Sequence, residues 1–388
     1  PVDGALAAAL ATGSSGRRLL VAAGNGEEAA LASASVEVRT ARTLLEVCAA
    51  LDGRKTLPLA SPRSYGETPM PDLADVRGQA QARRALEIAA AGAHHLLLVG
   101  PPGSGKTLLA SRLGGILPEP SDAEALEAAS IASASGRGLD LARWRQRPFR
   151  APHHTASAAA LVGGGSDPRP GEISLAHHGT LFLDELPEWS RHALEVLREP
   201  LESGSVSISR AARQCEFPAR FQLVAAMNPC PCGWAGDPSG RCLCSDEAIR
   251  RYRGRISGPL LERIDLHIEV PRLPPTALRT DGPPGEASAL VRARVVVARA
   301  RQYDRCGQPN ARLDQAQTNA FCRLSPRDTA LLERAVDGLQ LSARSLHRIL
   351  RVARTIADLA GSDAIETAHL AEAIGYRKLE RGSERAAA

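Results

Sequence analysis

An apolar strand-like segment, a glycine-rich octapeptide and a helix follow one another directly in this chain, and that succession constrains the fold most. His94–Val99 reads as a short buried strand and Leu108–Leu117 as a helix. Between them, GPPGSGKT matches the pattern G-x-x-x-x-G-K-[ST]. Glycines in such a loop let consecutive backbone N–H groups point at phosphate oxygens, and the helix amino terminus adds partial positive charge. The sequence therefore predicts a phosphate-binding loop on an α/β sheet.

The residues of this loop have expected roles. Lys106 would bridge the β- and γ-phosphates of a nucleoside triphosphate, and the Thr107 hydroxyl would bind Mg²⁺. Lysine is scarce here, because only Lys55, Lys106 and Lys378 occur among 48 basic residues. A lysine retained against that bias indicates a need for its compact ammonium, which a planar guanidinium cannot imitate. The expected nucleotide-binding residues are Gly100, Pro101, Pro102, Gly103, Ser104, Gly105, Lys106 and Thr107.

Two adjacent carboxylates follow another apolar strand. Leu181–Leu183 is predicted as a strand, and Asp184 and Glu185 come at its carboxyl end, where ligands gather in parallel sheets. Asp184 would hold Mg²⁺, directly or through water, and Glu185 would orient and deprotonate the attacking water. In the alternative interpretation, both acids only favour the amino terminus of a following helix. A further strand, FQLVAAMN, ends in Asn228, whose amide could order the same water against the γ-phosphate.

The chain divides into segments of different pattern. Residues 1–60 alternate short helical and strand-like pieces, with RRLLVAAG read as a buried strand and SVEVRT as an exposed one. Residues 61–72 read as a linker, and residues 73–270 alternate strands and helices. Residues 271–286 form a second linker, and residues 287–388 carry helical patterns only. The expected fold is an α/β core with a parallel sheet, preceded by a partial α+β segment and followed by a helical lid.

Composition excludes several classes of protein. With 388 residues, 44% of them hydrophobic, the chain can bury a sizeable core, which excludes a disulfide-stapled miniprotein and a disordered chain. No apolar run reaches about 18 residues, so no transmembrane helix is expected. The amino-terminal PVDGALAAAL lacks the basic start of a signal peptide, and eight cysteines without such a signal indicate reduced thiols in the cytoplasm. A net charge of +5 permits nucleic-acid contact without requiring it.

Half of the cysteines lie within residues 230–244. Cys230-Pro-Cys232 and Cys242-Leu-Cys244 flank a loop rich in glycine and proline, and four thiolates suit tetrahedral Zn²⁺. Such a loop buries little, so a metal would order it. The C-x-C spacing is tighter than the usual C-x₂-C, and free thiols, a redox pair or an iron–sulfur cluster stay open as alternatives. The scattered cysteines are expected to be small packing residues: Cys48, Cys215, Cys306 and Cys322.

These motifs, in this order, resemble those of an AAA+ ATPase, and four longer strings are more specific. FRAPHHTASAAALVGGG, RPGEISLAHHGTLFLDELPE, VLREPLESGSVSISRA and AAMNPCPCG resemble the Mg-chelatase-like YifB/ComM family. The resemblance covers nearly the whole chain. Residues 1–60 are similar to the end of that family's S5-like, Lon-protease-like amino-terminal domain, so an amino-terminally truncated member is expected. No serine–lysine protease pair can be assigned.

The resemblance implies residues that act between subunits. It puts Arg263 at the position of an arginine finger, which reaches the γ-phosphate of the neighbouring subunit. It puts Arg344 at the sensor position of the helical lid. The nearest alternatives to these two arginines are Arg255 and Arg348. A finger that acts in trans implies a ring, by analogy a hexamer.

The resemblance also makes two segments into insertions that project toward the pore of the ring. One is the arginine-rich stretch Ser130–Gly165, and the other is Ser205–Ala219, which reads as two strands around a basic turn. Arg210 and Arg213 at that turn suit phosphate contacts, although a solvated hairpin tip is the alternative. Adjacent histidines face poorly toward one ion, so no metal is expected at the two pairs, His153 with His154 and His177 with His178.

The expected function is movement of a strand through a ring, driven by hydrolysis of ATP with Mg²⁺. The resemblance implies DNA as that strand, with translocase or branch-migration helicase work in the recombination of incoming DNA. One alternative is a magnesium-chelatase subunit that drives metal insertion into a porphyrin, against which the cysteine loop and the Lon-like segment argue. The other is a nucleotide-binding scaffold with little turnover, against which the intact lysine, carboxylates and asparagine argue.

Overall fold

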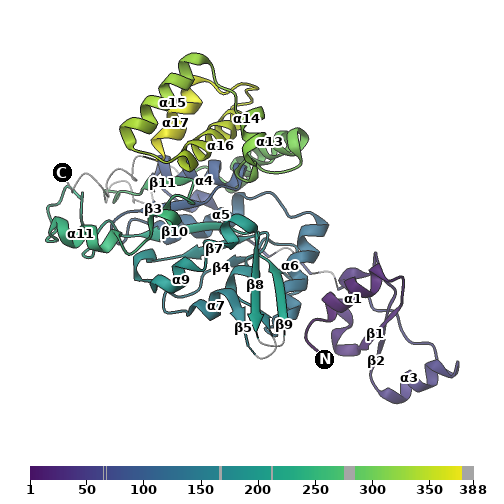
Figure 1. The fold of residues 1–388 in the computed structure, drawn as a ribbon. Coiled ribbons are helices and arrows are strands. Elements are labelled where there is room, and N and C mark those ends of the chain that lie inside the picture. The colour runs from purple at the N-terminus through teal and green to yellow at the C-terminus, as the bar shows by residue number, and fades with distance from the viewer. Residues whose placement is uncertain (64, 67, 166–167, 211–212, 275–284, 378–388) are drawn as a thin grey trace.

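The structure is a computed structural model. It describes residues 1–63, 65–66, 68–165, 168–210, 213–274 and 285–377. Within these ranges, an α/β core carries a small amino-terminal unit on one side and a helical domain on another (Figure 1). No helix of the described residues is long and apolar enough to cross a membrane.

A five-stranded parallel sheet forms the centre of the core, with the strand order β11-β3-β10-β7-β4. The three middle strands are buried at every residue because helices and loops cover both faces of the sheet. This arrangement confirms the expected α/β class. The strands are β3 (Leu96–Val99), β4 (Phe149–Arg150), β7 (Thr180–Leu183), β10 (Gln222–Met227) and β11 (Leu266–Glu269).

The two faces of the sheet belong to two different hydrophobic cores. Leu98 points to a core shared with α4 (Ala80–Gly92), α5 (Lys106–Ile116) and the helical domain. Leu97, the next residue, points to the opposite core, because successive side chains of a strand alternate. The remaining elements of the α/β core are α6 (Asp122–Ala134), α7 (Ala158–Val162), β5 (Gly163–Gly164), β6 (Arg169–Pro170), α8 (Glu172–Leu175), α9 (Arg191–Glu195), α10 (Pro200–Ser203), β8 (Ser205–Arg210), β9 (Arg213–Pro218), α11 (Asp246–Arg253) and α12 (Gly258–Leu261).

The stretch Ser130–Gly165, expected as an insertion, is partly built into the core. Its first residues belong to α6, and β4 pairs in parallel with β7 at the edge of the sheet. Two of its arginines are held by carboxylates of this chain: Arg147 by Glu124 at 2.9 Å and Arg150 by Glu172 at 2.7 Å. These side chains therefore support the core and do not project from it.

The carboxyl-terminal region is helical, as predicted, and its described helices pack over α4 and the amino-terminal edge of the sheet. His94 Nε2 lies 2.8 Å from Thr355 Oγ1, and Arg348 donates to Asp265 at 2.6 Å. The domain predicted as a lid thus contacts the edge of the sheet opposite the glycine-rich loop. Its helices are α13 (Ser288–Cys306), α14 (Gln315–Phe321), α15 (Pro326–Leu339), α16 (Ala343–Leu359) and α17 (Thr367–Gly375). Residues 275–284 of the second expected linker lie outside the described residues.

The amino-terminal unit is a two-stranded parallel sheet with short helices, and α1 packs against α6 of the core. The burial prediction for its strands was wrong. Alternate residues of β1 are exposed, whereas Val38 and Ala41 of β2 are buried. Cys48 is exposed and does not pack as expected. The elements are α1 (Ala5–Ser14), β1 (Leu19–Ala22), α2 (Gly26–Ala29), β2 (Val38–Ala41) and α3 (Leu44–Leu51).

Candidate active site

The glycine-rich loop connects β3 to α5 at the carboxyl-terminal edge of the sheet. Gly100 is pressed against the sheet, since a Cβ there would lie 2.2 Å from the Val270 carbonyl oxygen. Gly103 and Gly105 have φ angles of 75° and 92°, in the left-handed region that favours glycine. No described atom lies within 4 Å of the place a Cβ would take at either residue. The loop is therefore tight at its start and open where a phosphate would approach the backbone.

Lys106 begins α5, and its ammonium points back at the loop. It donates to the carbonyl oxygens of Gly100 and Pro101, at 2.7 and 2.9 Å, and to Asn228 Oδ1 at 3.2 Å. Burial lowers the pKa of Lys106, while the carboxylates of Asp184 and Glu185 act in the opposite direction. Every hydrogen-bond acceptor that Lys106 has among the described residues is a neutral oxygen.

The loop fits a bound triphosphate in two respects. A buried ammonium whose hydrogen-bond acceptors are all neutral is stabilised strongly when an anion binds, because hydrogen bonds between charged groups are stronger. In addition, the Ser104 hydroxyl is buried without a hydrogen-bond partner in the described part of the chain. Both groups lie in the segment that the sequence predicts to bind phosphate.

Thr107 and Asp184 come from different strand ends and meet at this edge. Thr107 Oγ1 donates to Asp184 Oδ2 at 2.7 Å. Asp184 Oδ1 accepts from the Glu185 N–H at 2.9 Å, and the Trp189 indole donates to the Asp184 carbonyl oxygen at 3.0 Å. A hydroxyl and a carboxylate are the oxygen ligands that Mg²⁺ prefers, so this pair could hold the ion of a magnesium–nucleotide complex.

The Glu185 carboxylate is half exposed and is held by a histidine. His154 Nδ1 lies 2.9 Å from Glu185 Oε2. The Glu185 backbone has φ of 51°, a left-handed conformation that costs a non-glycine residue about 1–3 kcal/mol. The sequence prediction missed this contact, because His154 drew attention only as part of an adjacent histidine pair. That pair was the one sequence signal that could have found it.

The strand-end argument thus brings five predicted residues together. Since β3, β7 and β10 are parallel neighbours, the residues that follow them emerge side by side. The five are Lys106, Thr107, Asp184, Glu185 and Asn228.

Arg263 lies at the opposite edge of the sheet. It precedes β11, and the backbone N–H of the nearby Asp265 donates to the His95 carbonyl oxygen at the start of β3. Since β3 is four residues long, about 13 Å of strand, at ~3.3 Å per residue, separates this edge from the glycine-rich loop. The Arg263 guanidinium is buried and donates to the Pro259 carbonyl oxygen and the Glu202 carboxylate.

The other predicted arginines divide between the two edges. Arg344 is exposed on α16 and lines a cavity of about 1190 Å³ between the core and the helical domain, on the Arg263 side. Arg348 donates to Asp265 and to the Arg263 carbonyl oxygen at 2.6 and 2.8 Å. Arg255 pairs with Glu188 at 2.9 Å, three residues beyond Glu185. Neither Arg263 nor Arg344 is near the glycine-rich loop of its own chain.

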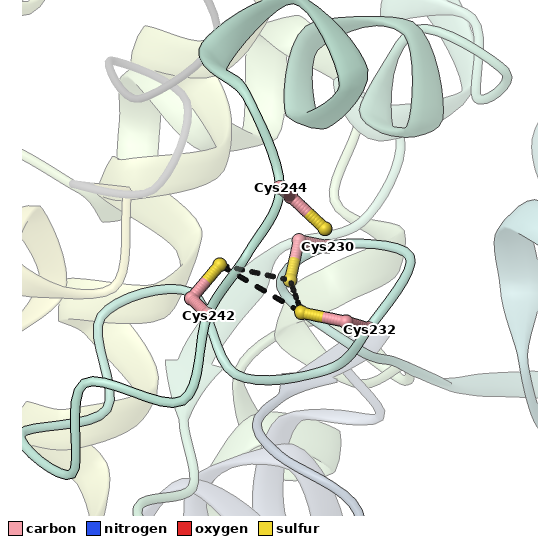
Figure 2. A group of neighbouring side chains, drawn as sticks. All are labelled: Cys230, Cys232, Cys242 and Cys244. Atoms are coloured by element: carbon pink, nitrogen blue, oxygen red, sulfur yellow. Dashed lines mark hydrogen bonds between the residues drawn. The ribbon is translucent and has the colours of Figure 1, made fainter.

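The four cysteines of the 230–244 loop converge on one point (Figure 2). Cys230 Sγ lies 3.4 Å from Cys232 Sγ and 3.8 Å from Cys242 Sγ, and Cys232 Sγ lies 3.7 Å from Cys242 Sγ. All four sulfurs, that of Cys244 included, lie within 4.8 Å of one another. Four sulfurs bound to one zinc at ~2.3 Å would be about 3.8 Å apart, so the thiols have the spacing of a tetrahedral site.

The two histidine pairs make contacts within the chain. His177 and His178 converge on Glu127, but His177 Nδ1 accepts the Arg220 N–H at 2.9 Å. Burial lowers the pKa of His177 to about 4, so the ring is neutral and its proton is on Nε2, which faces Glu127 at 3.3 Å. A protonated ring nitrogen cannot bind a metal. His153 makes its contact through Nδ1 with Thr155, at 2.9 Å.

The segment Ser205–Ala219 forms the predicted hairpin, in which β8 and β9 pair antiparallel. Residues 211–212 and the side chains of Arg210 and Arg213, proposed for phosphate contacts, lie outside the described residues. The backbone places both arginines opposite each other at the ends of the two strands.

The sequence matches two family models and several known proteins. Residues 72–278 match the family described as magnesium chelatase, subunit ChlI, and residues 285–377 match its C-terminal family. The competence protein ComM of Haemophilus influenzae is 51% identical over 386 residues, which cover 98% of this chain and 75% of that protein. The uncharacterized protein YifB of Escherichia coli is 49% identical over 381 residues, with the same coverage.

A magnesium-chelatase subunit ChlI is a more distant relative. The protein of that name from Anabaena variabilis is 24% identical over 207 residues, which cover 47% of this chain and 54% of that protein. The resemblance to the YifB/ComM family, which four sequence strings predicted, is thus confirmed by relatives that match almost the whole chain. This chain belongs to the Mg-chelatase-like family of AAA+ proteins that includes ComM and YifB.

Proposed function

We propose that this protein binds ATP with Mg²⁺ at the carboxyl-terminal edge of its sheet and hydrolyses it. The observation that carries the proposal is the pairing of Thr107 with Asp184, at 2.7 Å, beside a buried lysine with only neutral acceptors among the described residues. Lys106 and the loop N–H groups would bind the phosphates, and Thr107 with Asp184 would hold the metal. When bound, Mg²⁺ neutralises charge that develops on the phosphate oxygens.

Glu185 would act as the base and Asn228 would orient the attacking water. A positioned base of this kind contributes about 10²–10⁴ in rate. In the structure the Glu185 carboxylate is turned to His154. Proton transfer from water would therefore require Glu185 to leave His154 and face the γ-phosphate side of the loop.

We propose that the working enzyme is a ring, with Arg263 and Arg344 serving the nucleotide of the next subunit. Both residues lie on the edge that faces away from Lys106, so they can act only on a site that another chain brings to them. Arg263 would exchange the Glu202 carboxylate for a phosphate oxygen on assembly. A finger supplied in trans is worth about 10³–10⁵ in rate, so turnover would depend on ring formation. A hexamer is the expected ring.

DNA is the polymer that we propose this ring moves in the cytoplasm, as a translocase or branch-migration helicase. A relative that is 51% identical over almost the whole chain is named as a competence protein. The arginine-rich β8–β9 hairpin would supply phosphate contacts. The chelatase alternative has weaker support, since the chelatase subunit matches less than half of this chain at 24% identity.

We further propose that Cys230, Cys232, Cys242 and Cys244 bind Zn²⁺. The support is the spacing of 3.4–3.8 Å among the sulfurs of Cys230, Cys232 and Cys242, which agrees with about 3.8 Å for a ZnS₄ centre.

An ATPase assay of the purified protein tests the proposal, with no DNA, single-stranded DNA and branched DNA compared at equal nucleotide concentration. The expected result is Mg²⁺-dependent turnover that DNA increases. Stimulation only by a chelatase partner would favour the chelatase alternative, and tight ATP binding without turnover would favour the scaffold. Size determination with and without ATP tests the ring.

A further inference from the structure

We propose that the metal-bound cysteine loop is a structural part of the nucleotide site, and that it holds Asn228 and the rim of the phosphate-binding loop in their working positions. This inference rests on the proposed ATPase activity and on the proposed metal. It adds a dependence that neither of them requires: ATP affinity and turnover should follow the metal content of the four cysteines.

The cysteine loop begins immediately after the catalytic edge of the sheet. β10 ends at Met227, Asn228 follows, and Cys230 is only two residues further and fully buried. Asn228 Oδ1 accepts from Lys106 Nζ at 3.2 Å. A metal on Cys230 would therefore fix the backbone within two residues of the side chain that contacts the phosphate-binding lysine.

The far end of the loop begins the next helix. Cys244 precedes Ser245, whose hydroxyl accepts the Ala248 N–H at 3.2 Å and caps α11. From that helix, Arg253 Nε donates to the Pro229 carbonyl oxygen at 3.0 Å. One ion held by both C-x-C pairs would thus connect the end of β10, next to Asn228, to the start of α11.

The loop also touches the phosphate-binding loop directly. Gly233 has φ of 84°, and a Cβ there would lie 2.6 Å from Pro102 Cδ and 3.8 Å from Asn228 Cγ. The backbone of the cysteine loop is therefore packed against Pro102 without space for a side chain. Movement of Gly233 would uncover one wall of the loop that binds phosphate.

A second contact reaches the same loop by another route. The Trp234 ring lies 5.8 Å from the Arg272 guanidinium carbon, a cation–π distance. Arg272 follows Pro271, whose carbonyl oxygen accepts from Gln79 Nε2 at 2.7 Å, and the same nitrogen lies 3.3 Å from the Ser104 carbonyl oxygen. The cysteine loop thus supports the phosphate-binding loop at Pro102 and, through Gln79, at Ser104.

The cysteine loop buries little apolar surface besides its contacts at Gly233 and Trp234. Most of its residues between Pro231 and Cys244 are exposed or half-buried, and Leu243 is 94% exposed. A loop without an apolar core is ordered by its metal, because binding and folding share one free energy. Loss of the metal should therefore release Gly233 from Pro102 and loosen Asn228. A shift of ~1 Å in such a site can cost about 100-fold in rate.

The test compares cysteine variants with a matched control. Cys232→Ser and Cys244→Ser each remove one ligand, and Cys48→Ser removes an exposed thiol on α3, outside the loop. For each purified chain we would measure zinc per chain, the Kd of a fluorescent ATP analogue with Mg²⁺, and ATP turnover. The two loop variants should lose zinc and bind the analogue at least about tenfold more weakly, with a larger loss of turnover. Cys48→Ser should match the parent.

A second variant separates the packing contact from the metal. Gly233→Ala keeps all four cysteines, but its Cβ would press on Pro102. It should retain zinc and still weaken binding of the analogue. Zinc-free cysteine variants that bind and hydrolyse ATP like the parent would overturn the inference, as would a parent without metal. A parent that binds metal but does not hydrolyse ATP would contradict the proposed function instead.

Discussion

Replacement of His154 by alanine should raise the basal ATPase rate, because this histidine holds the Glu185 carboxylate, which the proposed mechanism needs free to act on water. The pair is separated by 2.9 Å, with about a third of the His154 side chain and half of the Glu185 side chain exposed. A contact between two side chains with this exposure contributes about 0.2–1 kcal/mol. If the contact must break before Glu185 acts, its removal lowers the barrier by no more than that amount, which corresponds to a rate increase of at most about fivefold.

The assay is steady-state ATP hydrolysis without DNA, at saturating ATP and Mg²⁺. His192→Ala is the matched control, since His192 is an exposed histidine of α9. An increase of up to about fivefold for His154→Ala alone would support the restraint. A rate that stays equal to the control would show that the contact does not limit turnover, and a clear decrease would show that His154 assists Glu185; either result would refute this reasoning.

Three further predictions concern assembly, stability and pH. Arg263→Ala should reduce turnover by about 10³ or more. Mixing this variant with Lys106→Ala chains should restore part of the activity, because mixed rings contain interfaces in which both residues are intact. No recovery on mixing would contradict action in trans. Glu172→Ala should lower the free energy of unfolding, measured with urea, by about 2 kcal/mol. This is less than the usual ~3–5 kcal/mol for a buried ion pair, because Arg137 and Arg150, which hold Glu172, are partly exposed. An unchanged urea midpoint would contradict this argument. Burial lowers the pKa of His95 and His177 to about 4 each. As the pH falls, the unfolded chain therefore binds these protons before the folded chain does, and the thermal midpoint should fall between about pH 6.5 and 4. A midpoint that does not change over this range would contradict the lowered pKa values.

The residues of the phosphate-binding edge could be predicted because parallel topology alone brings them together. Short apolar strands followed by Lys106, Asp184 and Asn228 have their carboxyl ends at one edge in any sheet of this kind. The parallel pairing of β10 with β3 and β7 then places these residues next to one another. The four cysteines could be predicted as a group for a similar reason, since two C-x-C pairs at the ends of one short loop cannot lie far apart.

The contacts that depend on irregular segments could not be predicted. His154 lies between β4 and α7, where no hydrophobic period sets the path of the chain, so its approach to Glu185 follows only from tertiary packing. The burial of β1 and β2 was predicted wrongly because the apolar content of a strand does not show which of its residues other elements cover. Gly233 gives no sign in the sequence that it packs against Pro102.

The position of the helical domain was also beyond the sequence. Helical periodicity predicted α13, α15, α16 and α17, but not the face on which they would pack. α16 lies on α4 and the amino-terminal edge of the sheet through a shared hydrophobic core and buried polar contacts such as His94 with Thr355. Such contacts join residues far apart in the chain and have no periodic pattern.

The most direct test of the central claim is ATP binding and turnover by the parent, Lys106→Ala and Glu185→Gln proteins in the presence of Mg²⁺. The parent should bind and hydrolyse ATP, Lys106→Ala should do neither, and Glu185→Gln should retain binding while losing turnover by about 10²–10⁴. A Lys106→Ala protein that binds and hydrolyses ATP as well as the parent would contradict the account.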